Sequence, residues 1–170
     1  MNQHFWNKAA VYGIILALVS VFIMVIQTIL PSDRWVSVLL WVAKLAGTLG
    51  LLFYFMKDFG KEKETYPYAD AFKFGLTVSF CSSIIAAAYY YLHVMFIFPD
   101  TATQFTNAML MGFEQAGITS EDFDTDKLVA RLPVILMISQ FIWFNILGLI
   151  WSSLLANGAK HKDPANPFTA

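Results

Sequence analysis

Charged residues are scarce in this chain of 170 residues: Asp, Glu, Lys and Arg make up 14% of it, whereas 58% is hydrophobic. This composition leaves too little polar surface for a water-soluble domain of this length. A soluble helical bundle would combine apolar stripes with charged faces, but the long apolar segments of this chain are apolar all round. The scarcity of charge therefore argues against a soluble domain and predicts that much of the chain is surrounded by lipid.

Cysteines and catalytic motifs are also lacking. Cys81 is the single cysteine, so no disulfide can form within the chain. The histidines His4, His93 and His161 are isolated in the sequence, with no second ligand at metal-binding spacing. No glycine-rich phosphate loop or nucleophile elbow is present. We therefore predict no enzyme, no cofactor and no metal site, and the mixed charges of residues 57–64 argue against nucleic-acid binding.

Four long apolar segments fill most of the chain. They cover residues 9–30, 35–56, 74–98 and 134–156. Each reaches the roughly 20 residues that a helix needs to cross about 30 Å of hydrocarbon. The first is longer than the core of a signal peptide and lacks a small-residue cleavage site, so we expect it to stay as a span. The sequence predicts an all-α, polytopic membrane protein whose four transmembrane helices form a bundle in a single domain, residues 1–170.

Lysine and arginine are distributed unevenly between the two ends of these segments. Arg34, Lys127 and Arg131 fall on one side of a four-span topology. The other side holds Lys8, Lys57, Lys61, Lys63, Lys73, Lys160 and Lys162. The positive-inside rule therefore places both termini in the cytoplasm, together with the tail of residues 157–170. The connection of residues 100–131 then faces outward.

This outer connection carries two helix signals. Apolar residues recur at helical spacing from Phe105 to Ala116, just before Gly117, which predicts a short amphipathic helix. Thr119 or Ser120 precedes several acidic residues, as is typical of a helix start. We expect a short helical connection between the third and fourth spans, which either extends the bundle or binds lipid or a partner.

One charged residue lies near the middle of an apolar segment. Lys44 follows Trp35 by nine residues, and no Asp or Glu lies in the core of any span. A charge at this depth costs about 2.5 to 3.5 kcal/mol on insertion scales. Lys44 must therefore use neutral acceptors, lose its proton or pair with a group outside the chain. The neutral candidates, apart from a tyrosine, are Gln140, Asn145 and Ser79.

Two interpretations of Lys44 stay open. The functional one is a site for an anion, a lipid phosphate or a proton, since ionisable residues inside the membrane are often functional. The structural one is a buried polar clamp that packs against the fourth span.

Small residues recur every four positions in several of the apolar segments, a spacing that lets helices approach closely. Most of them are expected to pack helices within the chain, and the others to form contacts between copies or with partners. The main packing positions are Ala43, Gly47, Gly50, Gly148 and Ser152.

Several short motifs follow one another along the whole chain. They are Phe5-Trp6, Tyr12-Gly13, residues 68–75, residues 145–150 and the lysine-rich tail that ends at residues 163–168. In this order the chain resembles the uncharacterised four-span membrane proteins abundant in Bacteroidetes, which are grouped as a domain of unknown function. The resemblance implies a location in the bacterial inner membrane and supplies no catalytic residue. Lys44 matches no motif of that family.

The sequence favours a non-enzymatic membrane subunit or scaffold, because small-residue helix faces without a reactive constellation suit packing with partners. The alternative is an oligomeric transporter, or a lipid-binding or anion-binding protein, centred on Lys44. A membrane enzyme would have to use the acidic residues 121–126, which are more typical of a solvated helix start. The expected partners are membrane lipids, and a second copy or another membrane protein.

Overall fold

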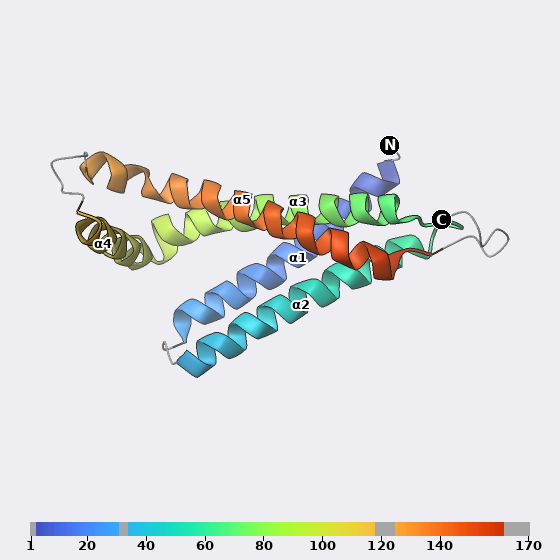
Figure 1. Ribbon diagram of the computed structural model, residues 1–170, viewed down its shortest axis with the longest axis horizontal. Coiled ribbons are helices and arrows are strands. Elements are labelled where there is room, and N and C mark those ends of the chain that lie inside the picture. Colours follow the sequence, from blue (N-terminus) through green and yellow to red (C-terminus); the bar gives the residue numbers. More distant parts are fainter. Residues whose placement is uncertain (1–2, 31–33, 118–124, 162–170) are drawn as a thin grey trace. The chain divides into compact units, whose positions relative to one another are not determined.

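The computed structural model describes residues 3–30, 34–117 and 125–161. Helices make up almost all of this part of the chain, and the described residues contain no strand beyond one isolated bridge. In chain order the helices are α1 (Gln3–Ile29), α2 (Arg34–Gly60), α3 (Tyr68–Leu92), the π-helix η1 (His93–Ile97), α4 (Pro99–Gln115) and α5 (Thr125–Ala159) (Figure 1). The predicted all-α fold is confirmed.

Four stretches of helix are long and apolar enough to cross a membrane. They cover residues 3–29, 34–60, 68–97 and 130–159. Each includes all or nearly all of one predicted apolar segment and extends beyond it at one end or both. The reason is that backbone hydrogen bonds continue into polar flanking turns, whereas the apolar pattern marks only the part that suits hydrocarbon.

Contacts divide the chain into two compact units. The first unit combines residues 1–86 and 143–170, and the second comprises residues 87–142. The first unit therefore contains α1, α2, the first part of α3 and the last part of α5. The second contains the end of α3, η1, α4 and the first part of α5.

The core of the first unit is rich in aromatic rings. Phe59 stacks on Phe74 with ring centroids 4.0 Å apart, and Tyr12 stacks on Phe55 at 4.3 Å. Around these rings are the buried residues Ala9, Leu16, Leu52, Met56, Tyr66, Ala71, Val78, Ala156 and Ala159. This core joins the start of α1, the end of α2, the start of α3 and the end of α5.

Two glycines allow close helix contacts in this unit. A Cβ on Gly13 of α1 would lie 2.5 Å from Cβ of Cys81 and 3.0 Å from the carbonyl oxygen of Val78, both in α3. A Cβ on Gly148 of α5 would lie 2.6 Å from Cβ of Ser79. Helices in a membrane gain much of their association energy from such close packing, so these glycines hold α1 and α5 against α3.

The second unit contains the helical connection that the sequence predicts. Phe98 departs from helical geometry, and Pro99 then occupies the first turn of α4. Gly117 follows the end of α4 with a φ of 76°, a left-handed conformation that suits glycine. The helix start predicted at Thr119 or Ser120 lies outside the described residues. From Thr125 onward, α5 is one continuous helix through the predicted fourth span.

His93 is the first residue of η1 in the second unit. Its ring is buried and lies near three aromatic rings, with centroid distances of 5.8 Å to Tyr89, 6.3 Å to Tyr90 and 4.9 Å to Phe98. The backbone N–H of Phe98 donates to the carbonyl oxygen of His93 at 2.8 Å, which closes the wider turn of the π-helix. His93 therefore occupies an aromatic environment inside this unit.

Candidate functional site

Lys44 is half-buried in α2 and has little polar support. Its Nζ atom lies 5.7 Å from the centroid of the Phe144 ring. Among the described residues, no carboxylate forms an ion pair with it. A cation–π contact contributes about 0.5 to 2 kcal/mol, which is less than the roughly 2.5 to 3.5 kcal/mol that insertion of the charge costs. The described chain therefore leaves the charge of Lys44 incompletely compensated.

The neutral residues predicted to compensate the charge of Lys44 either take part in other contacts or belong to the second unit. Nδ2 of Asn145 donates a hydrogen bond to Oγ of Ser83 at 2.9 Å, and the Ser83 hydroxyl donates to the carbonyl oxygen of Phe80 at 2.8 Å. Ser79 packs against Gly148. Gln140 lies in the part of α5 that belongs to the second unit. Asn145 and Ser79 thus contribute to the contact between α3 and α5.

The small residues predicted for helix packing fall into two groups. Ser152 is fully buried, and its Oγ would lie 3.0 Å from a Cβ on Gly75, so it belongs with Gly148 to the contact between α3 and α5. Ala43 is exposed, and a Cβ on Gly47 or on Gly50 would meet no atom within 4 Å. The described residues make no close helix contact at these three α2 positions, which belong to a set expected to pack mostly within the chain and otherwise against copies or partners. Small-residue spacing specifies a face that a helix can approach, and does not specify which helix approaches it.

Most of α2 is likewise left uncovered by the other described residues. All its buried residues lie between Leu52 and Gly60. Of its most apolar stretch, 6% is buried inside the chain, against 33% for the span of residues 68–97. The part of α2 that carries Lys44, Gly47 and Gly50 therefore presents a broad surface that the described residues of the first unit leave uncovered.

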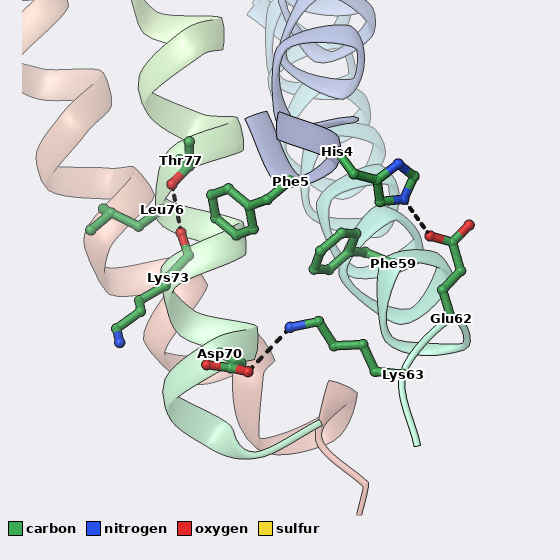
Figure 2. Close-up of a pocket in the computed structure, with 9 residues that line it drawn as sticks. All are labelled: His4, Phe5, Phe59, Glu62, Lys63, Asp70, Lys73, Leu76 and Thr77. Carbon is green, nitrogen blue, oxygen red and sulfur yellow. Dashed lines mark hydrogen bonds and ion pairs between the residues drawn. The ribbon is translucent and has the colours of Figure 1, made fainter. Parts of the chain in front are cut away.

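A second group of polar residues gathers at the aromatic end of the first unit, around a cavity of 650 Å³. Three helices contribute to its walls: α1 by its first turn, α2 by its end and the following loop, and α3 by its first turns (Figure 2). The lining residues are His4, Phe5, Phe59, Glu62, Lys63, Asp70, Lys73, Leu76 and Thr77.

Two sets of ion pairs surround this cavity. Nε2 of His4 lies 2.9 Å from Oε2 of Glu62, and Lys8 pairs with the other oxygen of the same carboxylate. These two neighbours, Lys8 first, lower the pKa of Glu62 below its usual value. On the other side, Nζ of Lys63 donates to Oδ2 of Asp70 at 3.1 Å (Figure 2). The same ammonium lies 5.0 Å from the centroid of the Phe59 ring.

The loop between α2 and α3 is held by a short backbone bridge. The N–H of Tyr66 donates to the carbonyl oxygen of His161 at 3.1 Å, and the N–H of His161 donates to that of Tyr66 at 3.0 Å. Nε2 of His161 also lies 3.0 Å from the carbonyl oxygen of Lys63. The end of α5 thereby fixes the loop that carries Glu62 and Lys63.

Tyr66 anchors this loop from inside. Its ring is fully buried, and a Cβ on Gly60 would lie 2.7 Å from it, so the ring packs directly on the backbone of α2. Burial, with a smaller effect from Asp70, raises the pKa of the Tyr66 hydroxyl above its ordinary value. Tyr66 therefore stays neutral and acts as an apolar anchor.

Sequence reasoning found Lys44 but not this cavity. His4 and Glu62 are 58 residues apart, so His4 was predicted to be isolated. Lys63 and Asp70 are seven residues apart on either side of a loop, and Lys63 was interpreted only as a topology signal. The sequence signal was the aromatic residue Phe5 next to His4, but nothing in the sequence says which helix ends meet there.

Together these features define a class of protein: an all-helical protein with four helices able to span a membrane. The family described as Protein of unknown function (DUF4199) matches residues 11–157. The chain belongs to this family, which confirms the resemblance to an uncharacterised membrane family. No curated protein and no solved structure matches the chain.

Proposed function

We propose that this protein is a non-enzymatic membrane subunit whose helix α2 binds a transmembrane helix of another protein. The observation that carries the proposal is the uncovered surface of α2, with an incompletely compensated charge at Lys44 beside two open glycines. Lipid tails can cover apolar residues but offer nothing to an ammonium at this depth. Small residues four positions apart, such as Ala43 and Gly47, allow a second backbone to come close.

The charge of Lys44 indicates what the partner carries. A buried ammonium is best compensated by a carboxylate that a neighbouring helix supplies. A second copy of this chain has none to offer at that depth. Its acidic residues are absent from residues 1–32, 34–57, 71–99 and 127–162. We therefore infer a different protein, with Asp or Glu within one of its own transmembrane helices.

Orientation is part of the same proposal: both termini lie in the cytoplasm, and the membrane is the bacterial inner membrane. The support is the excess of lysine on the side of the four-span topology where both termini lie. The cavity of Figure 2 then faces the cytoplasm, and α4 lies on the outer side.

Labelling with a membrane-impermeant maleimide tests this orientation. In a Cys81→Ala background, Gln104→Cys in α4 should react in intact spheroplasts, whereas Lys61→Cys should react only after permeabilisation. Both positions are exposed, so accessibility within the protein is matched. Labelling of Lys61→Cys alone before permeabilisation would reverse the proposed topology.

Affinity purification in native nanodiscs, with mass spectrometry of proteins and lipids, tests the partner. Lys44→Met should lower recovery of one transmembrane protein about tenfold or more, because loss of one member of a buried charge pair leaves the other unpaired. Gly47→Leu should have a similar effect, because the new side chain fills the space that the partner occupies. The matched control is Lys57→Met, which removes a lysine from the same helix near its end.

The control for folding is the melting temperature of each purified variant. Lys44→Met loses a cation–π contact but also removes an incompletely compensated charge, so we expect its free energy of unfolding to be unchanged or raised. Recovery of an anionic lipid that Lys44→Met loses, with no protein partner, would contradict the subunit and support the anion-binding alternative. Unchanged recovery of the partner from both variants would also contradict the proposal.

A further inference from the structure

The cavity at the end of the first unit has the size and lining of a small-molecule site. Its volume of 650 Å³ falls within the range of about 300 to 1,000 Å³ that is usual for such sites. Phe5 and Phe59 give it aromatic walls, and Leu76 adds an apolar side chain. The remaining lining residues are polar or charged, so the cavity suits a molecule with both kinds of surface.

The charges around the cavity are balanced. Lys63 and Lys73 contribute two positive charges, and Glu62 and Asp70 contribute two negative charges. A purely anionic or purely cationic molecule would meet repulsion from half of them. A molecule that carries one charge of each sign can satisfy both sets.

From this arrangement we propose that the cavity binds a zwitterionic head group, a phosphodiester joined to a primary ammonium. The phosphate accepts hydrogen bonds from the ammonium of Lys63, and the ammonium of the ligand donates to the carboxylate of Asp70. In a membrane this chemistry belongs to phosphatidylethanolamine, and in solution to glycerophosphoethanolamine. The inference is independent of the partner proposed for α2.

The ion pair between Lys63 and Asp70 can open for such a ligand. Both side chains are partly exposed, by 33% and 41%, and exposed pairs contribute little to stability. A zwitterion inserted between them leaves each charge with a partner of opposite sign. Figure 2 shows the two side chains facing each other from the loop after α2 and from α3, whereas Lys73 extends from α3 away from this pair.

The aromatic lining suits the ammonium half of the ligand. The ammonium of Lys63 already lies 5.0 Å from the centroid of the lining residue Phe59, which shows that this ring can accommodate such a group. Phe5 packs edge-on against Phe59, with centroids 5.7 Å apart, and extends the aromatic wall toward α1.

The position of the cavity along the helices suits a lipid head group. It lies where α1 begins, α2 ends and α3 begins, next to Trp6, which is 46% exposed, and Lys8. Tryptophan and lysine at helix ends favour the head-group level of a membrane. Further along the same helices, α1 and α3 carry exposed apolar residues, such as Val11 and Phe80, that acyl chains can contact.

Native mass spectrometry of the delipidated full-length protein tests the proposal, with phosphatidylethanolamine and phosphatidylglycerol as probes. The wild type should bind phosphatidylethanolamine about tenfold more tightly, because phosphatidylglycerol lacks the ammonium for Asp70. Lys63→Gln and Asp70→Asn should each weaken phosphatidylethanolamine binding about tenfold. The matched control, Lys61→Gln, removes a lysine from the same loop outside the cavity and should bind like the wild type.

A variant that fills the cavity tests the proposal without changing the ion pair of Lys63 and Asp70. Thr77→Phe retains every charge and places a ring in the cavity, so it should also abolish the preference for phosphatidylethanolamine. Competition by glycerophosphoethanolamine would identify the soluble head group as a ligand, and absence of competition would identify the lipid; both support the chemistry. Equal binding of the two lipids, or equal loss in Lys61→Gln and Lys63→Gln, would overturn it.

Discussion

Phe74→Ala is expected to destabilise the protein by about 3 to 5 kcal/mol, the largest effect of any single substitution considered. The Phe74 ring is fully buried and stacks on Phe59, and it meets Phe5 and Tyr12 edge-on. Its removal leaves a cavity where three helices meet, and the remaining rings cannot fill it without leaving their own contacts. The measurement is the melting temperature of the purified protein in mild detergent, together with the yield of monodisperse protein.

Phe80→Ala is the matched control. Phe80 is on the same helix but is 45% exposed, so its truncation removes surface that faces lipid or detergent. We expect a change of less than about 1 kcal/mol. Equal destabilisation by the two substitutions would show that Phe74 does not occupy the core described above.

Gly13→Leu is expected to have the second largest effect, a loss of about 3 kcal/mol or failure to accumulate as folded protein. Even the first carbon of a new side chain would lie 2.5 Å from Cβ of Cys81 and 3.0 Å from the backbone oxygen of Val78. The obstacle is partly backbone, so no side-chain rotation can relieve it. α1 would have to move away from α3, with loss of the packing that holds the first unit together.

Gly47→Leu provides the comparison for this substitution. It makes the same chemical change within a span, but no atom lies within 4 Å of the added Cβ. We expect the purified protein to be unchanged or more stable by up to about 1 kcal/mol, because leucine favours a helix more than glycine does. If Gly13→Leu melted at the same temperature as Gly47→Leu, the close contact between α1 and α3 would be contradicted.

Neither the burial of Phe74 nor the close contact of Gly13 could be predicted from the sequence. Phe74 lies at the start of a predicted span, and its burial was not predicted, since aromatic residues at span ends often face the membrane surface. Gly13 belongs to the Tyr12-Gly13 motif of the sequence, but only the structure shows that Val78 and Cys81 lie opposite it.

The same contrast applies to the sites. Lys44 stands out in the sequence, because a charge inside an apolar segment is costly whatever surrounds it. That it lies over the Phe144 ring, on a helix that the described residues leave largely uncovered, follows only from packing. Small-residue spacing could not separate Gly47 from Gly148, because the local pattern is similar and the neighbouring helix decides the outcome.

The sequence by itself determined the class of this protein: apolar segments of membrane-spanning length specify helices, because every backbone hydrogen bond must be made inside the segment when lipid surrounds it. The tertiary structure decided which residues meet. It joined His4 to Glu62, placed aromatic rings beside the pair of Lys63 and Asp70, and left the face of α2 around Lys44 open. These outcomes depend on contacts between residues far apart in the chain, and local sequence patterns carry no information on which helix ends come together.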